Sequence, residues 1–143
     1  LDFTHIKKYA APVTFDHYVN LEHGPIPSTI LNLINEAIED LDHSILSDAV
    51  SFEKVDGIDM FRLKPLREFS TKDEKYFTQS ELETLRAVCN RFGDKNTKFV
   101  EDVSHKEAPW KETGFLDSIP YTLATHDEDC LVTEEEIELA MSL

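Results

Sequence analysis

The sequence predicts a mainly helical α+β fold, in a single domain spanning residues 1–143, with a small antiparallel β-sheet packed on helices. Three observations support this. Apolar residues recur at helical spacing in several segments, two strand-like runs flank an Asp56-Gly57 pair, and a third strand-like run lies near 15–22. A chain of 143 residues is long enough for one core, and no linker divides it.

The first elements follow from local chemistry. Leu1 to Ile6 resembles the last turns of a helix, so we expect that the supplied residues omit part of a longer first helix. Tyr18 to Leu21 has the β-branched and aromatic content of a short strand, which Gly24, Pro25 and Pro27 should end with a rigid turn. Ser28 is then the expected N-cap of a helix reaching Leu41, with an apolar face that includes Ile30, Ile34 and Ala37.

A β-hairpin near 50–64 is the strongest local signal. Asp56-Gly57 between two strand-like runs predicts a two-residue type I′ turn, and Pro65 should end the second strand. With the strand near 15–22, the hairpin would form a three-stranded sheet.

Three later helices have clear start signals. Thr78 and Glu81 form a capping box before an apolar face that includes a buried Cys89, and Gly93 is the expected left-handed stop. Asn96 or Thr97 should cap a helix running to Ser104-His105. Thr133 and Glu136 form a second capping box near the end of the chain.

Charge restricts the class of partner. The formal net charge is −15, and residues 112–143 contribute nine acidic residues and no Lys or Arg. Direct binding to nucleic acid is disfavoured because such binding needs clustered cations, whereas a basic protein partner would be attracted. No apolar run is long enough to span a membrane, and we expect a soluble, cytoplasmic protein without a disulfide between Cys89 and Cys130.

No pattern predicts catalysis, a cofactor or a metal. The six histidines do not show the H-x-x-x-H spacing, adjacent Ser104 and His105 point apart, and no glycine-rich phosphate loop is present. An unrecognised enzyme site at His23 and His105 stays open as an alternative.

One ordered run of residues is more specific than any of these patterns. It comprises Tyr9, Pro12-Val13-Thr14, Asp16, Tyr18-Val19 and His23-Gly24-Pro25-Ile26-Pro27-Ser28, and farther along the chain Ser104-His105 precedes Trp110. In this order the run resembles the signature of the Panacea domain, the SocA-like antitoxin family that includes phage-associated proteins. Ala10-Ala11 stands where members usually have Gly-Arg, and Phe15 stands where they usually have Gly.

The resemblance implies an antitoxin-like domain that binds a protein partner. That partner would be a cognate toxin, neutralised by direct binding or presented by the domain, as an adaptor, to a cellular protease. A phage or mobile-element interaction protein without a toxin is the alternative. We expect Tyr18, His23, Pro25 and Trp110 to contact the partner, because aromatic residues and rigid turns are common in binding hot spots; the alternative for Tyr18 and Trp110 is core packing.

Overall fold

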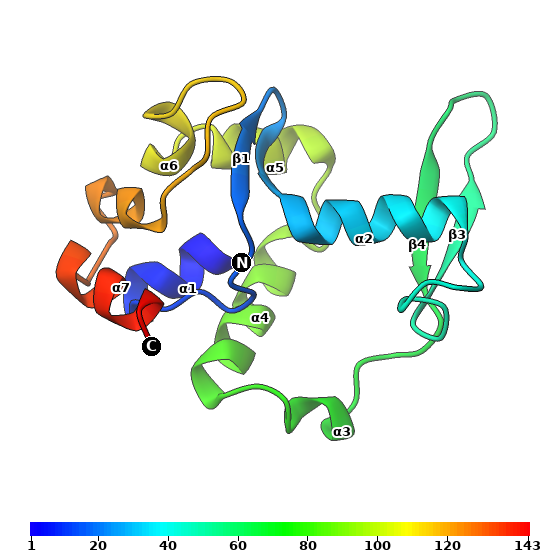
Figure 1. Ribbon diagram of the computed structural model, residues 1–143, viewed down its shortest axis with the longest axis horizontal. Coiled ribbons are helices and arrows are strands. Elements are labelled where there is room, and N and C mark those ends of the chain that lie inside the picture. The colour runs from blue at the N-terminus through cyan, green and yellow to red at the C-terminus, as the bar shows by residue number, and fades with distance from the viewer.

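The computed structural model describes residues 1–143 and is a mainly helical α+β structure (Figure 1). The helices are α1 (Asp2–Tyr9), α2 (Ser28–Glu39), α3 (Thr71–Glu74), α4 (Gln79–Phe92), α5 (Thr97–Ser104), α6 (Ala108–Lys111), the 3₁₀ helix η1 (Tyr121–His126) and α7 (Glu134–Met141). The strands are β1 (Tyr18–Leu21), β2 (Gly24–Pro27), β3 (Val50–Lys54) and β4 (Phe61–Pro65).

The core is built around α1. Phe3 and Ile6 of this helix pack against Ile119, Ala124 and Ile137 from the last third of the chain. Besides these apolar residues, α1 also buries Asp2, His5 and Lys7. The acidic segment 112–143 therefore folds back and forms one side of the core.

The strands form two separate two-stranded sheets. The prediction that the strand near 15–22 joins the hairpin in one three-stranded sheet is therefore wrong. β1 pairs antiparallel with β2, and β3 pairs antiparallel with β4. The sequence predicts only a turn at Gly24 to Pro27, but these residues form strand β2. The residue before each proline is held in the extended region, and here that preference produces a strand.

The hairpin is confirmed, but its turn is not type I′. Gly57 has a φ of +82°, whereas Asp56 has no positive φ, and the Ile58 N–H donates to the Val55 carbonyl. A positive φ at the second central residue alone is typical of a type II turn. Because the loop is longer than two residues, β4 begins only at Phe61.

The capping boxes of α4 and α7 and the Asn96 cap of α5 are confirmed. Two expectations about α4 are wrong. Gly93 follows the helix with a right-handed φ of −62°, and Cys89 is exposed, whereas Leu82 and Thr84 are the buried residues of this helix. Neither cysteine forms a disulfide.

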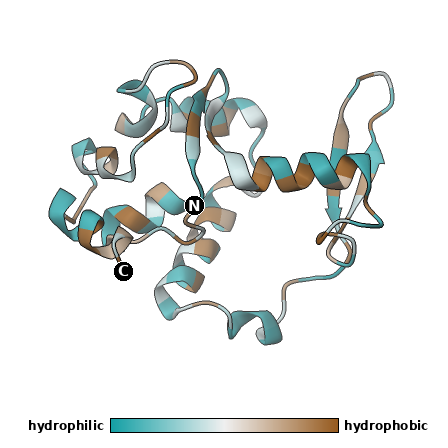
Figure 2. Cartoon of the chain, in the orientation of Figure 1, coloured by the Kyte–Doolittle hydropathy of each residue, from teal (hydrophilic) through white to brown (hydrophobic).

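Helix α2 and the β3–β4 hairpin form an arm, residues 28–66, that extends away from the other helices (Figure 1). Only Ala37 is buried on α2, and Ile30 and Leu31 remain exposed. Figure 2 shows apolar positions along the length of this helix. The apolar face that predicted burial is therefore covered only in part.

Candidate functional site

The hairpin formed by β1 and β2 places His23 at its tip, against helix α5. His23 Nδ1 lies 2.9 Å from Glu101 Oε1, and the imidazole is 73% exposed. The hydrogen bond to Glu101 raises the pKa of His23 above its ordinary value. Because this ion pair is exposed to solvent, we expect it to orient the tip more than to stabilise the fold.

Gly24 brings the hairpin backbone into close contact with α5. It is buried and has a φ of +125°, and a β-carbon built on it would lie 2.8 Å from Ser104 Oγ. Any other residue would collide with that hydroxyl and strain the backbone. The His23-Gly24-Pro25 segment is thus held in one position relative to α5.

Trp110 fixes the other strand of the same hairpin. Its indole N–H donates a 3.0 Å hydrogen bond to the Leu21 carbonyl, and its ring stacks on His105 with centroids 3.7 Å apart. The Asn20 side-chain amide donates to the carbonyls of Trp110 and Thr113 at 2.9 and 3.0 Å. Trp110 therefore has a structural role in holding β1.

Tyr18 also has structural contacts. Its hydroxyl donates to Asp2 Oδ2 at 3.1 Å, and its ring packs against Phe3 and Tyr121. Burial and the neighbouring Asp2 carboxylate both raise the pKa of the Tyr18 phenol. The hydroxyl therefore stays protonated and continues to donate to Asp2.

Beside β2 lies an apolar groove of about 320 Å³ between α1, α4 and α5. Its lining includes the charged residues Arg91 and Glu107 beside a larger apolar set, namely Tyr18, Pro25, Val88, Phe92, Val100 and Val103. Two of the four residues expected to contact a partner, Tyr18 and Pro25, thus share one cavity. His23 and Trp110 lie on the same hairpin assembly but do not line the groove.

Sequence reasoning missed the α4 and α5 side of this groove. Val88, Phe92 and Val100 occur at the helical spacing that predicts core positions. In the structure Val100 is 41% exposed, and Val88 and Phe92 are only partly buried. Periodicity identified the apolar face of each helix, but it contains no information on which part of that face stays uncovered.

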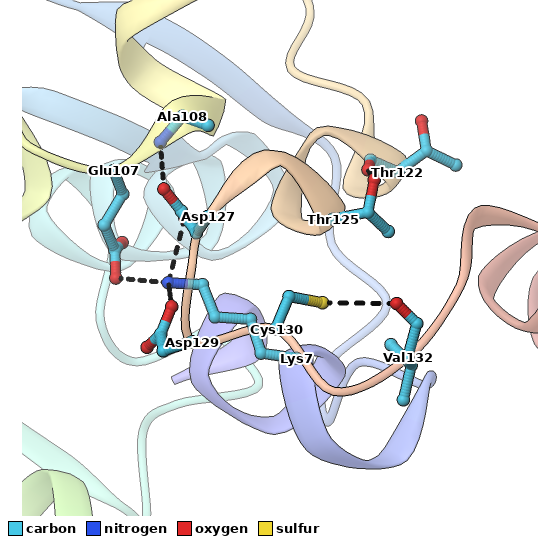
Figure 3. Close-up of polar contacts among 9 residues, drawn as sticks. All are labelled: Lys7, Glu107, Ala108, Thr122, Thr125, Asp127, Asp129, Cys130 and Val132. Atoms are coloured by element: carbon cyan, nitrogen blue, oxygen red, sulfur yellow. Dashed lines mark hydrogen bonds and ion pairs between the residues drawn. The ribbon is translucent and has the colours of Figure 1, made fainter.

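A second polar centre surrounds Lys7 (Figure 3). Its Nζ lies 2.9 Å from Asp127 Oδ2, 3.0 Å from Asp129 Oδ1 and 3.1 Å from Glu107 Oε1. Burial opposes the charged ammonium, but the hydrogen bonds to these acids outweigh it and raise the pKa of Lys7. Asp127 Oδ1 also accepts a 2.8 Å hydrogen bond from the Ala108 N–H, so this centre joins α1, α6 and the acidic segment.

The polar side chains do not gather into a metal-binding group. No group of three or more His, Cys, Asp and Glu side chains is placed to hold a metal ion. The Ser104 hydroxyl donates to the Glu101 carbonyl at 2.9 Å, and His105 Nε2 is buried without a hydrogen-bond partner.

None of the helices has the length and apolar character needed to cross a bilayer.

Comparison with known proteins gives one match. The family described as Antitoxin SocA-like, Panacea domain matches residues 1–111, which contain all of α1 to α6 and both hairpins. No curated protein and no solved structure matches the chain. The match covers more than three quarters of the 143 residues, and it includes His23, Gly24 and Trp110 at the hairpin. The chain therefore belongs to the SocA-like antitoxin, Panacea domain family.

Proposed function

We propose that this chain neutralises a cognate toxin by direct, non-catalytic binding in the cytoplasm. The contact surface is the apolar groove together with the His23–Pro27 segment beside it. The observation that supports this proposal is that Tyr18 and Pro25, both in the family signature, line one open apolar cavity. A mainly apolar groove lined by a few polar groups is typical of a binding site for a partner's side chains.

The rigidity of the hairpin favours tight binding. The contact between Gly24 and Ser104 and the bond from Trp110 to Leu21 hold the tip before a partner arrives. Little conformational entropy then remains to be lost when the complex forms. The net charge of −15 would in addition accelerate association with a basic toxin.

The test uses the product of the gene adjacent to this one, co-expressed with the chain in a growth-rescue assay. Val100→Arg places a second cation, besides Arg91, in the groove and removes an apolar side chain; because Val100 is 41% exposed, the fold should stay intact. We expect it to abolish rescue and to weaken the complex by about 2 kcal/mol, or about thirtyfold. Lys98→Ala, on the same helix but outside the groove lining, is the matched control and should rescue fully.

Thermal unfolding of both variants must first match that of the unchanged protein. Tyr18→Ala and Trp110→Ala are less suitable because both residues also stabilise the fold through hydrogen bonds. The proposal fails if the neighbouring product is harmless when expressed alone and no complex co-purifies. Full rescue by a folded Val100→Arg variant would exclude the groove as the contact surface.

A further inference from the structure

The outer edge of strand β4 is a separate surface that the groove does not use. β4 pairs only with β3, and all five of its residues, Phe61 to Pro65, are exposed. An exposed strand edge presents unpaired backbone donors and acceptors to other chains. This edge lies on the arm, away from the β1–β2 hairpin (Figure 1).

The register shows which backbone groups point outward. The Val55 N–H donates to the Met60 carbonyl at 3.0 Å, and the Leu66 N–H donates to the Ala49 carbonyl at 2.9 Å. In an antiparallel pair, hydrogen-bonded residues alternate with residues whose backbone groups face away. Arg62 and Lys64 therefore bond inward to β3, whereas the N–H and C=O groups of Phe61 and Leu63 face outward.

The other hairpin shows how this chain closes an edge. The Ser28 N–H donates to the His17 carbonyl at 2.9 Å, which places Pro25 and Pro27 at the outward positions of β2. Because proline has no N–H, that edge offers no donor at either position. On β4 the corresponding outward positions are Phe61 and Leu63, and only Pro65 is a proline. The outer edge of β2 is thus blocked by proline, whereas the outer edge of β4 is left open.

The side chains of β4 define what could pair with this edge. Phe61 and Leu63 lie on one face and are 44% and 42% exposed. Arg62 and Lys64 lie on the opposite face and share a single carboxylate, Glu53, at 3.9 and 2.5 Å. Two cations beside one acid leave a positive charge on this face, within a chain whose net charge is −15.

We propose that β4 accepts an extended segment of a protein partner as a third antiparallel strand, and that this segment alternates apolar and acidic residues. Its apolar residues would pack on Phe61 and Leu63, and its acids would lie beside Arg62 and Lys64. A second copy of this chain fits less well. Pairing β4 with itself would place Arg62 and Lys64 against the same cations, between two chains of charge −15.

Hydrogen exchange measured by NMR on the full chain tests this proposal. In the free protein the Arg62 and Lys64 amides should exchange slowly, and the Phe61 and Leu63 amides should exchange quickly. An eight-residue synthetic peptide alternating valine and glutamate is then added. At about 90% occupancy it should slow the Phe61 and Leu63 amides by about tenfold, with little change at Arg62 and Lys64.

Leu63→Pro removes the outward N–H without removing a bond to β3, so the hairpin should persist, as it does with Pro65. This variant should bind the peptide about fivefold more weakly, whereas Leu63→Ala, which keeps the N–H, is the matched control. If Leu63→Pro disrupts the hairpin, Arg62→Gln provides the second variant and should weaken binding of the valine–glutamate peptide.

Three results would overturn the proposal. They are no binding of the valine–glutamate peptide, equal binding of a peptide alternating valine and lysine, and slow exchange at Phe61 and Leu63 in the free protein. If that slow exchange appeared only as protein concentration rises, the edge would be a self-association surface instead. Because Val100 lies outside β4, the Val100→Arg variant should bind the peptide normally, which separates this proposal from the groove.

Discussion

At the scale of single residues, the segment between α1 and β1 holds two strained backbone positions. Ala10 and Phe15 have φ values of +62° and +56°, in the left-handed region that glycine tolerates best. These are the two positions at which the family resemblance predicts glycine. The family's glycines therefore have a conformational reason, and this chain keeps the geometry without them.

Phe15→Gly should stabilise the protein by about 1 kcal/mol, because it removes the steric cost of a left-handed β-carbon. Phe15 is 57% exposed, so the loss of its ring should cost little burial. Urea unfolding monitored by circular dichroism gives the difference in free energy. Phe15→Ala is the control, since it removes the ring but keeps the β-carbon, and a gain of the same size from alanine would refute the strain argument.

Asp16, rather than the predicted Ser28, caps helix α2. Its carboxylate accepts hydrogen bonds from the N–H groups of Thr29 at 2.8 Å and Ile30 at 2.9 Å. The Ser28 hydroxyl instead donates to the His17 carbonyl at 2.7 Å. Burial of Asp16 opposes its ionisation, but the backbone bonds from Ile30 and Thr29 outweigh burial and lower its pKa. The charged form is thus the one that the fold requires.

Asp16→Asn should reduce the free energy of unfolding at pH 7 by about 1–2 kcal/mol, because an amide nitrogen replaces one accepting oxygen. A lowered pKa in the folded state means that the stabilisation is present above the unfolded value, about 3.9, and is lost as pH falls through the folded value. The difference between the two proteins should therefore shrink below about pH 4. Denaturant titrations from pH 3 to pH 7 measure it, and a difference independent of pH would argue against a charged cap.

Ser28→Ala is the matched variant for this comparison. It removes the hydroxyl that the sequence alone suggests as the cap, and it should cost only about 0.5–1 kcal/mol. A larger loss from Ser28→Ala than from Asp16→Asn would reverse the assignment.

At the scale of elements, the short helix α1 depends on its surroundings. It has only eight residues, too few for stability in isolation, and it buries the polar residues Asp2, His5 and Lys7. Asp2 accepts bonds from the N–H groups of Val13 and Thr14, at 2.9 and 3.0 Å. These contacts attach α1 to the loop before β1, while Lys7 attaches it to the acidic segment.

Lys7→Met keeps most of the side-chain volume but leaves Asp127 and Glu107 without their cation. We expect a loss of about 3 kcal/mol, since removing one partner of a buried ion pair leaves uncompensated charge. Thermal and urea unfolding check this value. Lys8→Met, at the exposed neighbouring position, is the control and should be nearly neutral. A neutral result for Lys7→Met would show that the cluster contributes little.

At the scale of the whole molecule, the arm (residues 28–66) and the rest of the chain, here called the body, differ in how many of their residues are buried. Only 17 of 143 residues are buried, and those that form the main apolar cluster come from α1, η1, α7 and the segment before η1. The arm buries only Ala37 and leaves large apolar side chains exposed, among them Ile30, Ile58, Met60 and Phe61. Exposed apolar residues of this kind are typical of surfaces that bind other proteins. The groove in the body and the edge of the arm are thus two separate candidate surfaces.

The sequence by itself determined the family, the mainly helical class, the hairpin around Gly57 and the starts of α4, α5 and α7. These features depend on local chemistry, such as the Thr78 and Thr133 capping boxes, which acts within a few residues. Tertiary structure alone decided that Asp16 caps α2 and that Lys7 binds acids 100 or more residues away. Such contacts join residues whose separation is not encoded in any local period, so only the packed chain brings Tyr18, Pro25 and Val100 to one groove.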